Sequence, residues 1–443
     1  MIADDVVEKR GENSSFPSFS TKNISLRDSG GNIGGVAVLS SALSAARRKL
    51  RVALEEFRAS PPSLCNLTLN FSLTDVIDAI GRLSPDIRHL AVLGTGGSTL
   101  CPQALTGALG KSGNPGKRVC FIDNVDYEEI APLLHTLPPE RTAFVAISKS
   151  GNTLETLAQT MHCMEWFQRA ASPRLTIADR FLMISDPPKA GATNRLRALG
   201  AHYGVPVIDH EAIGGRFSIF TAVGLLPAAF LGIDVHGVAA GAREAASEAF
   251  EDGSVASEAA LCHYLAERAG FAVDILMSYS HKFKGFTAWL AQLRAESLGK
   301  KGYGLTPVTS VGTLDQHSQL QLFLDGKPDK LFTVLYEKNA NDPAMRCDLP
   351  QNVDMRGLRG ASLSQVLIAS ARATIESLSA TGAPVRAFSP DAVDARFVGK
   401  LAMQSMIETI VAARLFGVDP YTQPAVEAGK RRATEMLESG ENR

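Results

Sequence analysis

The stretch TAFVAISKSGNT, residues 142–153, joins an apolar run to a turn rich in hydroxyl groups. Four similar apolar runs lie near it, separated by segments of helical length: HLAVLG (89–94), VCFID (119–123), FLMIS (181–185) and VPVID (205–209). Apolar strands that alternate with helices are typical of a parallel sheet covered on both faces. The region is therefore predicted to be an open α/β domain that binds ligands at the carboxyl edge of its sheet.

A second α/β region is predicted further along the chain. FAVDILMSYS (271–280) and KLFTVLYE (330–337) read as strands, and FKGFTAWLAQLRAES (283–297) reads as an amphipathic helix between them. The segment from Ala395 to Leu415 has helical periodicity, and DPYTQP interrupts it before a last helix from about Ala425. We expect two doubly wound domains with parallel-rich sheets flanked by helices, divided as follows: a polar and helical N-terminal extension at 1–60, a first domain at 61–240, a second domain at 241–390, and a C-terminal helical segment at 391–443.

The composition excludes several classes of protein. A chain of 443 residues with 45% hydrophobic content can bury a large core. Its formal net charge of −1, with both signs interspersed, shows no basic surface for nucleic acid. The apolar stretch at 219–233 is interrupted by Pro227 and closed by Asp234, which predicts a buried core helix and no membrane span. A small-molecule partner is therefore expected.

The cysteines and the N-terminus point to a reducing compartment. The six cysteines show neither a CxxC pair nor a metal-ligand spacing: Cys65, Cys101, Cys120, Cys163, Cys262 and Cys347. They are interpreted as buried or idle thiols. The first residues contain acids and no apolar segment of signal-peptide type, so the expected location is cytoplasmic. None of the nine histidines forms an HExxH or similar set, and no metal site is expected.

Two turns at the predicted sheet edge could bind an anion. Gly94 to Ser98, GTGGS, puts flexible backbone at a strand-to-helix turn, although it lacks the GxGxxG and GK[ST] patterns of nucleotide loops. A purely structural tight turn is the alternative. The second turn presents the hydroxyls of Ser148, Ser150 and Thr153 with the cation of Lys149, which suits a phosphate monoester. An ordinary polar helix cap is its alternative, but the neighbouring glycine-rich turn favours phosphate.

The second turn also carries a resemblance. SKSGNTLET is similar to the phosphate loop of the sugar isomerase fold, which occurs in isomerases, in the isomerase half of glucosamine-6-phosphate synthase and in sugar-phosphate-sensing regulators. Four further segments, in matching order, resemble the glucose-6-phosphate isomerase family, in particular its shorter bacterial members: GTGGST (94–99), GGRFSIFTAVGL (214–225), QLRAESLGKKG (292–302) and QPAVEAGK (423–430). The resemblance spans roughly residues 90 to 430. It implies two domains of the sugar isomerase fold.

The resemblance also implies roles for single residues. Glu296 would be the base that moves a proton between C1 and C2, and Arg216 would stabilise the enediolate. His317 and Lys430 would assist ring opening, because imidazole exchanges protons near neutral pH. Substrate and phosphate contacts would come from Gly97, Ser98, Ser148, Lys149, Ser150, Thr153, Gln292 and Gln423. The family's MESNGK appears here as AESLGK, a difference that affects local packing next to Glu296. Its QWGVE appears as QPAVE, which is interpreted as a subfamily difference.

The implied activity is the reversible isomerisation of glucose 6-phosphate and fructose 6-phosphate through ring opening and a cis-enediolate. This is a step of glycolysis and gluconeogenesis, and it needs no metal or other cofactor. The resemblance places His317 in the neighbouring subunit's site, so a homodimer is expected. Two alternatives stay open: a phosphosugar isomerase of broader specificity, which also accepts mannose 6-phosphate, and a non-catalytic sugar-phosphate sensor. Two observations argue against a sensor. A protein that only binds does not require the combination of Arg216, Glu296, His317 and Lys430, and the sequence has no recognisable helix-turn-helix segment.

Overall fold

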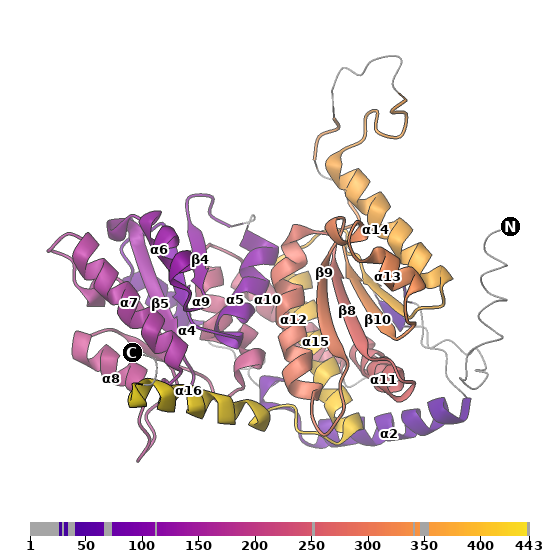
Figure 1. Ribbon diagram of the computed structural model, residues 1–443, viewed down its shortest axis with the longest axis horizontal. Helices are drawn as coiled ribbons and strands as arrows, with labels where there is room; N and C mark the ends of the chain where they lie inside the picture. Colours follow the sequence, from indigo (N-terminus) through magenta and orange to yellow (C-terminus); the bar gives the residue numbers. More distant parts are fainter. Residues whose placement is uncertain are drawn as a thin grey trace.

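The computed structural model describes residues 26–28, 31–33, 40–65, 73–110, 113–249, 253–339, 342–345 and 354–440. Figure 1 shows two α/β halves side by side, with helices between their sheets. Among the described residues, no helix is both long enough and apolar enough to cross a membrane. Cys347 lies outside the described residues.

The first half contains a five-stranded parallel sheet, and its strands confirm the five apolar runs. In spatial order they are β4 (Arg118–Ile122), β3 (His89–Leu93), β5 (Thr142–Ile147), β6 (Phe181–Ser185) and β7 (Val207–Asp209). The residues of β5 and β6 are all buried, which explains why their sequences are apolar without alternation.

Helices cover both faces of this sheet. Leu90 and Val92 of β3 belong to the same buried cluster as residues of α4 (Thr74–Arg82), α5 (Gly97–Leu109) and α9 (Ala222–Phe230). The alternate residues Ala91 and Leu93 pack with α6 (Tyr127–His135), α7 (Leu154–Ala170) and α8 (Arg195–Tyr203) on the other face. The apolar stretch at 219–233 thus contributes the buried helix α9, as expected.

The second half contains a four-stranded parallel sheet. Its spatial order is β11 (Val385–Phe388), β10 (Lys330–Leu335), β8 (Val273–Ser278) and β9 (Thr306–Val311). The predicted strands at 271–280 and 330–337 are β8 and β10, the two central strands. The sequence did not identify β9 and β11, which are the edge strands. The side chains of β9 are only partly buried, so they lack the continuous apolar run of a central strand.

The remaining helices lie around the second sheet or between the two halves, except α16, which extends below the first half in the view of Figure 1. They are α2 (Ser40–Ala59), α10 (Val235–Glu248), α11 (Val255–Arg268), α12 (Lys284–Leu298), α13 (Leu320–Asp325), α14 (Leu363–Ala380), α15 (Ala395–Phe416) and α16 (Glu427–Ser439). Two short strands, β1 (Leu26–Asp28) and β2 (Gly31–Ile33), form an antiparallel pair. The predicted helices at 283–297 and 395–415 are α12 and α15. The domain boundaries stay predictions.

The helix α12 lies between the two halves and packs against α5 of the first (Figure 1). Its crossing with α5 is close, since a Cβ atom added to Gly285 would lie 2.5 Å from the backbone oxygen of Gln103. Buried side chains of α12, including Trp289, share one continuous apolar core with α5, α9 and α15. The C-terminal half of α12 is thereby held beside the carboxyl edge of the first sheet.

Candidate active site

The two predicted turns lie side by side at the carboxyl edge of the first sheet. The strands β3 and β5 pair in parallel, so the turn after Leu93 is adjacent to the turn after Ile147. Gln159 of α7 donates a hydrogen bond of 3.4 Å to the backbone oxygen of Gly94 and so links the helix after the second turn to the first turn. This is the sheet edge at which an open α/β domain binds its ligand.

Gly97 allows the first turn to touch the backbone that carries Arg216. A Cβ atom at Gly97 would collide with the backbone of Gly215 and of Arg216. The absence of a side chain therefore has a packing reason in addition to the anion-binding one. Ser98 is partly buried in the first turn of α5, at the helix N-terminus, where backbone N–H groups point outward.

A hydrogen bond within the second turn stabilises it. Ser148 is buried and donates a hydrogen bond of 3.0 Å from its hydroxyl to the hydroxyl of Thr153. Thr153 precedes α7 but makes no capping hydrogen bond, so the interpretation as an ordinary helix cap does not account for its side chain. Lys149 and Ser150 are exposed. This arrangement leaves a cation and hydroxyl groups near the N-terminus of a helix.

Arg216 lies in the 3₁₀ helix η4 (Gly215–Phe220) and is 2% exposed. Its guanidinium donates to Ser297 Oγ at 2.8 Å, Glu296 Oε2 at 2.8 Å and Gln423 Oε1 at 2.9 Å, and also to the backbone oxygen of Pro420. Burial lowers the pKa of Arg216, and the Glu296 carboxylate opposes that shift. Guanidinium nevertheless stays charged at working pH, so the site contains a fixed cation.

Trp289 and Cys101 fix the main chain beneath this guanidinium. The indole nitrogen of Trp289 donates a hydrogen bond of 2.9 Å to the backbone oxygen of Arg216. The buried thiol of Cys101 contacts the same oxygen at 3.8 Å. Both residues come from helices that meet at the junction of the two halves, α12 and α5.

Glu296 connects Arg216 to Gln292. Its carboxylate accepts from Arg216 through Oε2 and from Gln292 Nε2 at 3.0 Å through Oε1. The side chain keeps 34% exposure, so the carboxylate can still contact a bound molecule. Gln292 also borders the first turn, because a Cβ atom at Gly96 would lie 2.9 Å from its amide nitrogen. The predicted residues Gln292, Glu296, Arg216 and Gln423 thus form one hydrogen-bonded group beside the two turns.

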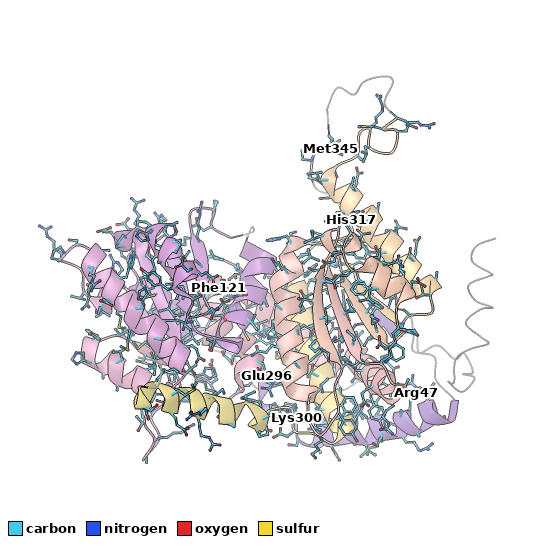
Figure 2. All side chains as sticks on the ribbon, in the orientation of Figure 1. Arg47, Phe121, Glu296, Lys300, His317 and Met345 are labelled. Carbon is cyan, nitrogen blue, oxygen red and sulfur yellow. The ribbon has the colours of Figure 1, made fainter. Side chains whose placement is uncertain are left out.

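Two predicted residues lie outside this group. His317 is exposed and follows β9 and a short 3₁₀ helix; Figure 2 shows it at the end of the second sheet away from Glu296. Lys430 lies in α16, has 61% side-chain exposure and pairs with Glu427 at 2.9 Å. Gln423 precedes the 3₁₀ turn that leads into α16 and points to Arg216. Of the two predicted C-terminal residues, Gln423 is hydrogen-bonded to the group within this chain and Lys430 is paired with Glu427 instead.

Sequence reasoning missed three residues that hold the group together. Ser297, Trp289 and Lys300 contact Arg216, its backbone or the backbone of Glu296. Lys300 belongs to the quoted segment QLRAESLGKKG, so its place in the motif was the one signal available. The contacts of Ser297 and Trp289 join positions 81 and 73 residues apart and leave no local pattern.

Among the residues that the structure describes, no group of three or more His, Cys, Asp or Glu side chains is placed to hold a metal ion. Cys101, Cys120, Cys163 and Cys262 are free thiols. Burial raises the pKa of Cys65 and of Cys120 to about 11, so both remain thiols at neutral pH. Their role is in packing.

Comparison with known proteins shows which family the chain resembles. The family profile for phosphoglucose isomerase matches residues 72–327, more than half of the chain. A probable glucose-6-phosphate isomerase from Haloarcula marismortui is 35% identical over 368 residues, which cover 82% of this chain and 81% of that protein. A glucose-6-phosphate isomerase from Thermus thermophilus is 34% identical over 78% of this chain and 83% of its own length.

A solved structure shows the same fold across nearly the whole chain. The crystal structure of a hypothetical protein from Thermus thermophilus superposes with a TM-score of 0.80 and 32% sequence identity, covering 90% of this chain and 96% of that one. The two parallel sheets, the site at the edge of the first, and the extent of these matches lead to one assignment. This chain belongs to the phosphoglucose isomerase family.

Proposed function

We propose that this chain is a glucose-6-phosphate isomerase, which interconverts glucose 6-phosphate and fructose 6-phosphate. The observation that carries the proposal is the hydrogen-bonded group of Gln292, Glu296, Arg216 and Gln423 beside the two turns that are predicted to bind an anion. A partly exposed carboxylate next to a fixed guanidinium supplies a base and a stabilising cation in one place. The names of the relatives support the choice of substrates.

In this proposal, the phosphate group anchors the sugar at the edge of the first sheet. The contacts come from the hydroxyls and the cation of the two turns: Ser98, Ser148, Lys149, Ser150 and Thr153. The close approach of Gly97 to the backbone of Gly215 brings this anchor next to Arg216. Binding energy from the distant phosphate then positions the reacting carbons against Glu296.

Glu296 moves the proton between the two carbons. Starting from the open-chain aldose, its carboxylate takes the proton from C2, and the electron pair moves to the C1 carbonyl oxygen as the cis-enediolate forms. Return of the proton to C1 and transfer of the hydroxyl proton from O2 to O1 give the ketose. As Glu296 takes the proton, negative charge moves from its carboxylate to the enediolate oxygen. Arg216 is hydrogen-bonded to the Glu296 carboxylate and is therefore close enough to stabilise this charge.

We further propose that the active form is a homodimer with shared sites. Ring opening needs a group that delivers a proton to the ring oxygen, and His317 and Lys430 are assigned to this step. His317 lies at the opposite end of the second sheet from Glu296 in the same chain (Figure 2). A second subunit could place its own His317 at this site, and then each site would contain residues of both chains.

The proposal is tested with purified protein and fructose 6-phosphate in an assay coupled to glucose-6-phosphate dehydrogenase. Formation of glucose 6-phosphate without added metal is the expected result. A parallel assay with mannose 6-phosphate measures epimer selectivity, and the expected turnover of glucose 6-phosphate exceeds that of mannose 6-phosphate. Binding of either sugar phosphate with no turnover would contradict the proposal and indicate a sugar-phosphate sensor.

A further inference from the structure

Lys300 follows the C-terminal end of α12, and its ammonium group is surrounded by three backbone oxygens. It donates to the carbonyl of Glu296 at 2.7 Å, of Ser297 at 3.0 Å and of Asp419 at 2.6 Å. An ammonium group has three N–H donors, so each donor has one acceptor. The first two carbonyls belong to the last turn of α12, where the helix dipole favours a cation. The third belongs to a distant segment of the chain.

That distant segment, residues 419–423, carries Gln423 and is held by a second cation. Arg216 donates to the backbone oxygen of Pro420 and to the Gln423 side chain. Between its two ends, the ring of Tyr421 packs against Phe217 with centroids 5.4 Å apart. Residues 419–423 are thus attached to the site by Lys300 at one end and by Arg216 at the other.

The electrostatic surroundings make the charge of Lys300 sensitive to pH. Three charged groups face it: Arg216, Asp419 and the side chain of Glu296. Burial lowers the pKa of Lys300 to about 8; Arg216 adds to this shift, and the two carboxylates oppose it. Lys300 is therefore half protonated only slightly above neutral pH.

We propose that protonated Lys300 is a positioning residue that holds the 419–423 segment against the C-terminal end of α12, and so keeps Gln423, Arg216 and Glu296 aligned for catalysis. This inference rests on the proposed isomerase function. The hydrogen bonds that Lys300 makes to the described residues go to backbone oxygens, so it acts through the residues that it places. Deprotonation leaves an amine with two N–H donors, which cannot donate to all three carbonyls. It also removes the positive charge from the C-terminal end of the helix.

The pH dependence of activity and of stability should then run in opposite directions. Activity is expected to fall as the pH rises through about 8, because Lys300 loses its proton. The usual pKa of a lysine is 10.5, so between these two values the unfolded chain binds more protons at Lys300 than the folded chain does. Folding therefore gains stability from this group as the pH rises. Alkaline loss of activity that comes from Lys300 is thus distinguishable from unfolding.

The decisive measurement is the pH profile of kcat/KM with fructose 6-phosphate for the unchanged chain, Lys300→Arg and Lys300→Met. Arginine stays charged, so Lys300→Arg should keep kcat at neutral pH within about threefold and lose the decline near pH 8. Lys300→Met should lower kcat about tenfold at neutral pH while KM changes less than about threefold, because the phosphate anchor is intact. Lys284→Met changes an exposed lysine in the first turn of α12, at the other end of the helix, and as the control it should resemble the unchanged chain.

A second measurement does not depend on activity. Tyr421 lies within the 419–423 segment, and cleavage after it by chymotrypsin reports how firmly the segment is held. Lys300→Met should be cleaved there about tenfold faster, with the Lys284→Met rate unchanged. A decline near pH 8 that persists in Lys300→Arg, or unchanged cleavage in Lys300→Met, would overturn the inference. An inactive unchanged chain would instead refute the isomerase proposal, and the cleavage rates would still decide whether Lys300 holds the segment.

Discussion

At the scale of single residues, Arg216 determines the geometry of the site. It contacts the proposed base, an amide that belongs to the C-terminal segment, a serine of α12 and a backbone carbonyl. The Arg216 side chain is almost fully buried and its N–H groups donate in several directions, so it has little freedom to change rotamer. The proton transfer proposed for Glu296 therefore takes place beside a cation whose position is determined in advance.

The role of Glu296 as base predicts the result of a single substitution. Glu296→Gln should lower kcat by at least about 10²-fold, because an amide cannot accept the C2 proton, while sugar-phosphate binding changes little. Steady-state kinetics and equilibrium binding of fructose 6-phosphate measure the two effects separately. Glu165→Gln, on the exposed surface of α7, is the control and should keep normal turnover. Near-normal turnover of Glu296→Gln would remove Glu296 from the mechanism.

The phosphate anchor predicts a change in binding. Ser148→Ala combined with Thr153→Ala should weaken both fructose 6-phosphate and inorganic phosphate, measured as a competitive inhibitor, because the two ligands would share these hydroxyls. Ser172→Ala, in the loop after α7, serves as the control. If the double substitution weakens the sugar but leaves phosphate inhibition unchanged, the turn contacts another part of the sugar.

The residues that could be predicted from sequence are those in contiguous motifs. Ser148 and Thr153 stand in one turn, and Glu296 stands in a segment that resembles a family motif. Lys300 was visible in that segment but had no assignable partner, because its third acceptor, the oxygen of Asp419, lies 119 residues away. Long-range contacts of this kind depend on the assembled fold, and a single sequence contains no pattern that reports them.

At the scale of elements, α12 is held in place by a buried ionic cluster next to the site. Arg294, two residues before Glu296, donates to Asp274 of β8 at 2.5 Å and to Glu408 of α15 at 2.8 Å. Arg386 of β11 donates to the other oxygen of Glu408 at 2.8 Å. Removal of one partner from such a cluster leaves an uncompensated charge in a buried position. The central strands and α12 were predictable from apolar patterning, whereas this cluster of charges was not.

The cluster predicts a large loss of stability for one substitution. Glu408→Gln should reduce the free energy of unfolding by about 3 to 5 kcal/mol, because Arg294 and Arg386 lose their shared carboxylate. Urea unfolding followed by circular dichroism measures the loss. Glu165→Gln breaks an exposed pair with Arg169 and should cost less than about 1 kcal/mol. Equal effects of the two substitutions would show that the cluster does not stabilise the fold.

His263 of α11 borders the same cluster, with its Nε2 3.5 Å from Asp274 Oδ2, and it predicts how stability depends on acid. Burial lowers the pKa of His263 to about 4, Arg294 adds to the shift, and Asp274 opposes it. Between pH 4 and the usual value of 6.5, the unfolded chain binds more protons at His263 than the folded chain, so stability should fall as the pH drops through this window. Unfolding free energies of the unchanged chain and of His263→Gln, measured across the window, should show a shallower slope in the variant. An unchanged slope would assign the acid sensitivity to other groups.

At the scale of the whole molecule, the two sheets present their carboxyl edges to different places. The edge of the first sheet faces the C-terminal half of α12 and Glu296, while His317 lies beyond the edge of the second (Figure 2). In a single chain, the proposed base therefore lies apart from the proposed ring-opening histidine. This separation was not predictable from the order of the motifs, because the relative placement of the halves depends on how α5, α12 and α15 pack.

The shared-site dimer predicts rescue between two inactive variants. When His317→Ala and Glu296→Gln are mixed under conditions that exchange subunits, random pairing makes about half of the dimers mixed, and each mixed dimer has one intact site. About a quarter of the normal activity should therefore return. Subunit exchange is confirmed independently by mass-tagged chains. An absence of rescue with exchange confirmed would contradict shared sites, and an active monomer on size-exclusion chromatography would contradict the dimer requirement.

The close crossing of α5 and α12 also bears on how the protein can move. Many two-lobed enzymes exclude water by a hinge motion that swings one lobe onto the other. Here such a rotation would separate Gly285 from the backbone of Gln103 and divide the apolar core that both halves share. A packed core resists continuous deformation. Access to the site should therefore be gated by short local segments, with the two lobes moving as one rigid body.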